Sequence, residues 1–481
     1  MVHDKVLSRK GLLKAGAVAG ASLAAVASPL GAQGLAMARY SERLARQPLD
    51  STQKISLKFY SRGSEAYHTF FRAASAAFMH MHPNVTITYE PQGRDYRTKL
   101  LVEIAGGAGP DIAAVPDDIC RSYAAHGALM DLAPFFKADG LSRDSYWPAA
   151  LNPQWLGPHL FAMPYDYGMH IMYYNKALFD KQHISYPTEQ WTWDDYVRVG
   201  RHLTIDSNGK RASDPGFQPD HVVQYAGDNN MQIEGTNSIV RSFGGEWASS
   251  DLSKATLDTP AAIKAFQWMA DVGAKYYINP APDVATSLNF ALEQGNVAMH
   301  FDGTWSFSTY AAYPILKWDQ GNVDILPFLK GPKGRAVVAE ASGVAVPKGT
   351  KPQNAKWAWE FVKYMSSVPG QRLAFKYGVA SITNFPSLTK ELIGTIKQPR
   401  NKDIITRYLP QARLPYWCEA ISDQELEGLL FPPFGAATEL LDLFNGKKTA
   451  AQVMSTFNKR VQALLDNDQK LAKQMGVTLS L

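Results

Sequence analysis

The sequence predicts an α/β fold built around a mainly parallel sheet. Two short runs, residues 55–59 and 85–89, alternate apolar and polar side chains with the period of a half-buried strand. Two stretches with helical patterning follow them, residues 65–81 and residues 96–105, and the second ends at Gly106. Strands that alternate with helices of this length form βαβ units, which place ligands at the carboxyl ends of the strands.

The rest of the chain continues this mixture of short strands and helices. Residues 111–115, 168–174 and 296–301 are apolar, β-branched or aromatic runs and are expected as strands. Thr192 precedes a helical stretch that opens with Trp193-Asp194-Asp195, and it is a suitable N-cap. The further expected helices, in order, are residues 260–270, 355–366, 436–444 and 450–466.

The composition is that of a large folded protein and excludes several classes. Of the 481 residues 46% are hydrophobic and 11% are aromatic, which is too many for a disordered chain, and the length predicts two or three domains at roughly 150 residues each. The net charge of +5 is small for this length and disfavours a nucleic-acid partner. Two cysteines, Cys120 and Cys418, exclude a disulfide scaffold, and we do not expect them to pair because they stand in segments assigned to different domains.

The first 38 residues differ from the rest and predict an export signal peptide. Four basic residues precede a charge-free run, rich in Ala and Gly, that ends in the small-x-small pattern Ala36-Met37-Ala38. The start resembles a twin-arginine signal with Lys10 in place of the second arginine, so that route and the general secretory route both remain open. Removal of the four basic residues and of Asp4 lowers the net charge from +5 to +2. Residues 39–53 are polar and are expected to be a flexible leader.

Seven short motifs occur in an order and with separations that point to one family. They are Gly109-Pro110-Asp111-Ile112, residues 173–179, residues 191–196, residues 295–299, Gly303-Thr304-Trp305, Pro332-Lys333-Gly334 and residues 358–362. With them the chain resembles the extracellular solute-binding proteins of ABC importers, in the sugar-binding branch similar to maltose-binding protein. No later segment offers the ~20 apolar residues of a membrane helix, so we expect a periplasmic protein.

The resemblance implies two hinge-linked α/β lobes of the type II-like periplasmic-binding-protein fold, with a ligand cleft between them. Carried onto this chain, lobe one comprises residues 51–163 plus 298–337, and lobe two comprises residues 164–297 plus 338–481. The hinge strands are expected near Pro164–Asp166 and near Phe301. The implied partners are a carbohydrate and the membrane permease, and we expect a monomer without cofactor, metal or catalytic residues.

Residues that could bind a sugar stand on loops at the ends of the expected strands. Sugar rings pack on flat aromatic faces, while their hydroxyls need planar polar partners such as carboxylates and guanidinium groups. The candidate ligand-binding residues are Arg62, Glu90, Gln92, Asp117, Asp118, Tyr165, Asp166, Tyr167, Trp247, Asp302, Trp305, Ser342, Gly343 and Trp417. We therefore expect capture of a sugar or oligosaccharide by lobe closure, followed by delivery to the permease.

Several alternatives remain open on the sequence. A glycerol phosphate ester would favour arginine, so Arg62 keeps that ligand possible, whereas a polyamine would demand several carboxylates. A secreted glycan-active enzyme would need a pair of carboxyl groups, for which Glu419 and Asp423 are candidates, but no Gly-x-Ser-x-Gly, His-Glu-x-x-His or Walker motif is present. A sensor subunit that feeds no transporter is a further possibility.

Overall fold

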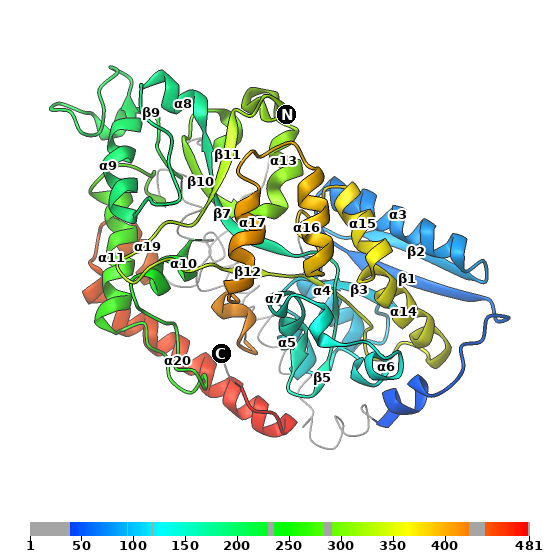
Figure 1. Ribbon diagram of the computed structural model, residues 1–481. Coiled ribbons are helices and arrows are strands. Elements are labelled where there is room, and N and C mark those ends of the chain that lie inside the picture. The colour runs from blue at the N-terminus through cyan, green and yellow to red at the C-terminus, as the bar shows by residue number, and fades with distance from the viewer. Residues whose placement is uncertain are drawn as a thin grey trace, which may run out of the picture.

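The computed structural model describes residues 39–93, 95–117, 119–228, 235–282, 291–422 and 438–479. Within these residues the chain forms two α/β lobes, each around its own sheet, which confirms the predicted two-lobed fold (Figure 1). In the described part of the chain no helix combines the length and the apolar character needed to cross a membrane. The expected signal peptide, residues 1–38, lies outside the described residues.

The first lobe is built on a five-stranded sheet with the order β2-β1-β3-β13-β6. Its strands are β1 (Ile55–Ser61), β2 (Val85–Pro91), β3 (Ile112–Val115), β6 (Met163–Pro164) and β13 (Gly343–Ala345). β1 runs parallel to β2 and β3, with Ile55 opposite Val85, and β13 runs antiparallel to β3. Helices α3 (Glu65–Met81) and α4 (Tyr96–Ala105) make the connections from β1 to β2 and from β2 to β3, so the predicted βαβ units are confirmed.

Helices α14 (Pro352–Met365) and α15 (Val368–Lys376) lie beside α3 on one face of this sheet (Figure 1). Aromatic side chains fill the space between the helices and the sheet. Phe59 of β1 meets Phe71 and Phe361 edge to face, at 5.1 and 5.5 Å between ring centroids. Such contacts are favourable beyond the apolar area they bury, by about 0.5–1.5 kcal/mol each, and they fix the sheet under its helices.

The second lobe is built around the long strand β7, whose eight residues are all buried. Its strands are β7 (Gly168–Asn175), β10 (Met299–Gly303), β11 (Val323–Pro327) and β12 (Ala339–Glu340). β10 and β11 flank β7, β12 pairs with its first residues, and all three run antiparallel to it. The expectation of a mainly parallel sheet therefore holds for β1, β2 and β3 only.

Helices pack around the second sheet and on one another (Figure 1). They are α8 (Lys176–Lys181), α9 (Trp193–Leu203), α10 (Thr236–Ser242), α11 (Pro260–Ala274), α19 (Thr438–Phe444) and α20 (Ala450–Met475). Thr192 caps α9 in a capping box with Asp195, as the sequence predicted. α20 is longer than expected because its apolar face continues past residue 466 and packs on both lobes, against α11 and α19 on one side and α5 (Cys120–Ala125) on the other.

Shorter elements complete the two lobes and the region between them. The helices are α6 (Ala133–Ala138), α7 (Pro148–Leu151), α13 (Phe307–Ala311), α16 (Pro386–Thr395) and α17 (Asp403–Tyr408), and the strands are β4 (Trp155–Leu156), β5 (His159–Leu160), β8 (Ile205–Asp206) and β9 (Val222–Gln224). Figure 1 places α16 and α17 between the two sheets. The second lobe's core contains Ile393 of α16 and Ile405 of α17.

Within the residues that the structure describes, the chain crosses between the lobes at three places, and this corrects the predicted assignment of the return segments. The first crossing, residues 165–167 between β6 and β7, lies where it was expected. The second is residues 341–342 between β12 and β13, not Phe301. A third follows α15, where Val379 packs in the first core and Ile382 in the second.

Residues 298–337 therefore belong with the second lobe, and the segment from β13 to α15 belongs with the first. The reason is strand pairing: β10 and β11 hydrogen-bond to β7, and β13 hydrogen-bonds to β3. The predicted boundaries at 298 and 338 were wrong for these two segments because pairing over more than 100 residues leaves no local sequence signal.

The expected flexible leader, residues 39–53, is partly structured. Residues 39–45 are helical, Leu44 is 2% exposed, and it packs in the core of the first lobe. Lys356 of α14 donates to the carbonyl oxygens of Gln47 and Pro48. The prediction failed because a single buried leucine and two backbone contacts are enough to dock a short polar segment.

Candidate functional site

A cavity of about 300 Å³ lies where the crossings meet the carboxyl ends of β1 and β3. The cavity is lined by Arg62, Gly63, Tyr67, Arg97, Pro116, Asp117, Tyr165, Asp166, Tyr167, Gly168, Trp305, Glu340, Ser342, Val379 and Trp417. Its walls come from the first lobe, from all three crossings and from the second lobe. Eight of the candidate residues stand in this lining: Arg62, Asp117, Tyr165, Asp166, Tyr167, Trp305, Ser342 and Trp417.

The other candidates lie elsewhere. Glu90 lines a separate cavity with Lys58 at the side of the first sheet, and Gln92 accepts a hydrogen bond from Lys99. Gly343 is paired inside β13 with Val115. Asp118 lies outside the described residues.

Trp247 and Asp302 are the two candidates that the structure buries away from the cavity. Trp247 is 1% exposed and stacks on Tyr416 at 5.3 Å between ring centroids, inside the core of the second lobe. Asp302 accepts a hydrogen bond of 2.6 Å from Tyr310 and lies 3.5 Å from the imidazole of His300. The sequence predicted loop positions at strand ends for both, but the surrounding chain covers both side chains.

Seven residues of the lining are not among the candidates: Gly63, Tyr67, Arg97, Pro116, Gly168, Glu340 and Val379. Tyr67 and Arg97 stand in the first turns of α3 and α4, directly after the strand-end loops that contain Arg62 and Gln92. A search extended by one helical turn beyond each strand end would have found both. Val379 could not have been found in this way, because it follows a helix and reaches the cavity only through the third crossing.

Asp166 joins the first two crossings to the first lobe. Its Oδ1 accepts a hydrogen bond of 2.8 Å from the backbone N–H of Ser342, and its Oδ2 accepts one of 3.2 Å from the hydroxyl of Tyr67. Removal from water raises the pKa of the Asp166 carboxyl to about 7, and the charge of Asp117 adds to this rise while the two donors oppose it. Asp166 is therefore a cavity group whose charge changes near neutral pH.

Tyr165 fixes the neighbouring part of the first crossing. Its ring lies edge to face against Phe71 at 5.2 Å and against Tyr67 at 6.3 Å, and it is 5% exposed. Its N–H donates to the carbonyl of Ser342, and its own carbonyl accepts a hydrogen bond from the side chain of Gln371. These contacts hold the backbone next to Asp166 in one position.

Trp305 lies against two glycines at the adjacent ends of β7 and β10. A Cβ atom at Gly168 would stand 2.3 Å from the indole ring, and one at Gly303 would stand 2.2 Å from it. Only glycine permits this close approach, so the strand ends form a fitted seat for the ring. His170 of β7 packs edge to face on Trp305 at 5.3 Å. The partly exposed ring is thereby held rigidly in the cavity wall.

An acidic corner of the cavity brings together three elements that are far apart in the sequence. One ligand atom each of Asp117, Glu340 and Cys418 lies within 4.8 Å of the others. The thiol of Cys418 donates to Asp117 at 3.1 Å, and Glu340 lies 3.2 Å from the Nε2 of His170. The carboxylate oxygens of Asp117 and Glu340 are suited to accept hydrogen bonds from ligand hydroxyls. With the sulfur of Cys418 they form a group of three potential metal ligands.

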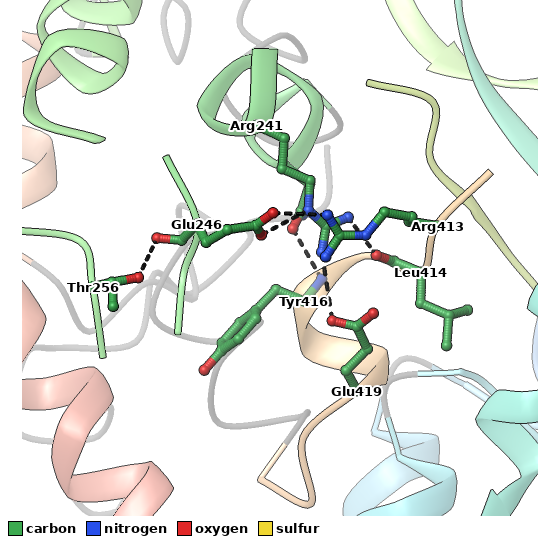
Figure 2. Close-up of polar contacts among 8 residues, drawn as sticks. Arg241, Glu246, Thr256, Arg413, Leu414, Tyr416 and Glu419 are labelled. Carbon is green, nitrogen blue, oxygen red and sulfur yellow. Dashed lines mark hydrogen bonds and ion pairs between the residues drawn. The ribbon is translucent and has the colours of Figure 1, made fainter. Parts of the chain in front are cut away.

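The short turn that carries Trp417 and Cys418 is anchored by Arg241 of α10 (Figure 2). Arg241 donates to the carbonyl of Leu414 at 2.7 Å and pairs with Glu419 at 3.4 Å, so it holds both ends of the turn. Its Nε also pairs with Glu246, which in turn binds Arg413 at 2.7 Å. Burial raises the pKa of the Glu419 carboxyl to about 7 although nearby arginines oppose the rise.

A second buried polar network includes His300 and Asp302 of β10. His300 contacts Asp228 at 2.5 Å and the hydroxyl of Tyr310 at 2.6 Å. Although burial disfavours charge on His300, the carboxylates of Asp228 and Asp302 raise the pKa of its imidazole well above the ordinary value. These contacts tie His300 of β10 to Asp228 and to Tyr310 close to the strand end that leads to Trp305.

Comparison with known families identifies the chain. The family of bacterial extracellular solute-binding proteins matches residues 63–372. The chain belongs to this family. A probable ABC transporter-binding protein of Deinococcus radiodurans is 23% identical to this solute-binding protein over 292 residues, which are 60% of this chain and 66% of the relative. The match thus spans slightly less than two thirds of that relative.

Solved structures have the same fold. The ABC substrate-binding protein of Listeria monocytogenes in complex with cycloalternan superposes with a TM-score of 0.71 at 19% identity, over 89% of this chain and all of that protein. UgpB of Mycobacterium tuberculosis in complex with glycerophosphocholine superposes with a TM-score of 0.66 at 18% identity, over 86% of this chain and 98% of that protein. At this level of identity the likeness establishes the two-lobed solute-binding fold.

Proposed function

We propose that this solute-binding protein captures a sugar or oligosaccharide between its lobes and delivers it to the permease of an ABC importer. The observation that carries the proposal is the cavity lining, in which the ring of Trp305 stands with the carboxyl groups of Asp117, Asp166 and Glu340. An aromatic face packs on the C–H groups of a sugar ring, and carboxylates accept hydrogen bonds from its hydroxyls. The cycloalternan complex of the Listeria protein supports the same ligand class.

Closure of the lobes supplies the signal to the importer. Asp117 belongs to the first lobe and Trp305 to the second, so a ligand that touches both adds contacts only when the lobes approach one another. A ligand shifts a conformational equilibrium by its difference in affinity for the two states. The closed, ligand-bound shape is therefore the form that the permease binds. We place this event in the periplasm, after export directed by residues 1–38.

A glycerol phosphate diester is the second candidate ligand. Arg62 and Arg97 line the same cavity, and guanidinium groups bind phosphate with two parallel hydrogen bonds. The glycerophosphocholine complex of UgpB supports this alternative. Three carboxyl groups in the lining favour a neutral polyol over an anion, because a phosphate would have to approach them against charge repulsion.

A thermal-shift screen tests the proposal. A ligand that binds only the folded state raises the Tm, so mono- and oligosaccharides, glycerol phosphodiesters and polyamines should be compared side by side. We expect a shift with a sugar, and mass spectrometry after long incubation should recover that sugar intact because we expect no turnover. A shift with phosphodiesters or polyamines alone would replace the sugar assignment, and turnover of an oligosaccharide would make the protein an enzyme.

A further inference from the structure

A second cavity lies between the lobes on the other side of the turn that carries Trp417. Its volume is about 540 Å³, and it shares no lining residue with the first cavity. The first lobe contributes the region from Arg121 on α5 to Gly157 after β4, and the second contributes residues 412–414, Glu419, Thr478 and Leu479. The proposed sugar function does not use this cavity.

Arginine dominates the charge of this second cavity. Its lining contains Arg121, Arg143 and Arg413 but a single carboxylic acid, Glu419. Glu419 is 6% exposed, and burial raises the pKa of its carboxyl to about 7, so it carries only part of a negative charge near neutral pH. The net charge of the residues that line this cavity is therefore +2 or more near neutral pH.

The guanidinium groups on the first-lobe side are held in place. Arg121 donates to the backbone carbonyl of Glu419 across the lobes and to the carbonyl of Asn152 at 3.3 Å. Arg143 lies over the ring of Trp155, with its guanidinium carbon 4.6 Å from the centroid, and it donates to Oδ1 of Asn152 at 2.9 Å. Stacking and hydrogen bonding orient the planar groups before any ligand arrives.

Donors remain for a ligand. A guanidinium group carries five N–H donors. Within the described residues Arg143 uses one of them, on Asn152, and its side chain is exposed at the mouth of the cavity. Arg413 on the opposite wall pairs with Glu246, whose carboxylate is shared with Arg241 (Figure 2). Because the single carboxylate of Glu246 is shared between Arg241 and Arg413, Arg413 also keeps N–H donors for a ligand.

We propose that this arginine-lined cavity binds a small oxyanion, a phosphate or a carboxylate, that bridges the two lobes. Planar guanidinium groups recognise both kinds of anion through paired N–H donors. Because Arg143 and Arg413 stand on different lobes, an anion between them contacts both only when the lobes are close. A bound oxyanion that contacts both walls therefore favours the arrangement in which Arg143 and Arg413 are close together.

The test uses the full mature protein without any sugar. Sodium phosphate and sodium citrate are titrated separately at constant ionic strength, and binding is followed by the rise in Tm and by calorimetry. We expect saturable binding of at least one of the two anions. Saturation with phosphate would indicate a phosphate site, and saturation with citrate would indicate a carboxylate site. Arg143→Gln should weaken this binding by about tenfold or more. Arg413→Gln provides a second variant on the opposite wall.

Arg72→Gln is the matched control, because Arg72 is an exposed arginine of α3 that pairs with Glu65 far from the cavity. It should bind the oxyanion as the wild type does. A rise in Tm that follows salt concentration without saturation, or equal binding by Arg143→Gln and the wild type, would overturn the proposal. A failed sugar screen would leave this result unaffected, because no sugar is present.

Discussion

At the scale of single residues, side chains that follow β1 and β3 reach the first cavity, whereas Gln92, which follows β2, does not. Arg62 follows β1, Asp117 follows β3, and both line it, as the rule for α/β sheets predicts. The side chains of Trp247 and Asp302 are also of types that can bind a sugar, but neighbouring elements cover them. Sequence supplies the chemistry of a side chain, whereas its exposure depends on which distant segments pack on it.

Trp305 provides the sharpest test at this scale. We expect Trp305→Ala to weaken binding of the sugar found in the screen at least tenfold, about 1.4 kcal/mol, because the ring forms part of the cavity wall. Calorimetry measures the affinity. Tyr277→Ala is the control, since Tyr277 is 37% exposed and lies outside the lining of the first cavity. An unchanged affinity in the Trp305 variant would remove this ring from the ligand site.

Asp166 should make stability depend on pH. Its pKa of about 7 in the folded protein exceeds the ordinary value of ~4, so the folded state holds a proton that the unfolded chain has lost over this interval. The contribution of Asp166 to the free energy of unfolding therefore falls as pH rises from about 4 to 7. Asp166→Asn removes this fall, and the Tm of the variant relative to the wild type should be higher at pH 8 than at pH 5.

The control for this pH experiment is Asp251→Asn. Hydrogen bonds from Ser249 and Ser253 lower the pKa of Asp251 to about 2, so it stays ionised at both pH values. Its Tm difference from the wild type should be the same at pH 5 and pH 8. Equal differences for the Asp166 variant at the two pH values would show that this carboxyl does not titrate near neutrality.

At the scale of elements, local pattern predicted most helices and strands, because period and capping are local properties. The bounds of α3 and α4 and the N-cap Thr192 agree with the prediction. Trp357 and Trp359 are two apart on α14, a spacing that turns the two side chains to different sides of a helix, yet both are 2% exposed. α14 packs on strands of the first sheet and on α3 and α15 together, and a helix enclosed on several sides buries more than one face.

The turn from Leu414 to Glu419 should depend on Arg241. Arg241→Met leaves the buried carboxyl of Glu419 without its partner, and we expect the free energy of unfolding to fall by about 3 kcal/mol. Arg413→Met removes an exposed ion pair with the same Glu246 and should cost less than about 1 kcal/mol. Urea unfolding measures both. Equal losses would mean that Arg241 does not anchor the turn.

At the scale of the whole molecule, strand pairing between distant segments could not be read from the sequence. The two lobes and the first crossing were predicted, but the segments that return to each lobe were exchanged. β12 and β13 are two and three residues long and lie two residues apart, yet they belong to different sheets. No periodicity in so short a stretch tells which sheet it joins.

The discontinuous lobes also set the order in which the chain can fold during synthesis. β3 gains its second neighbour only when Gly343–Ala345 has been made, and α14 follows that strand. The first sheet can therefore be completed only after more than 200 further residues have been synthesised beyond β3. Contacts between segments so far apart in the sequence form slowly. An N-terminal fragment that stops before residue 343 cannot complete either lobe, so the chain reaches its folded state as one unit and only near its full length.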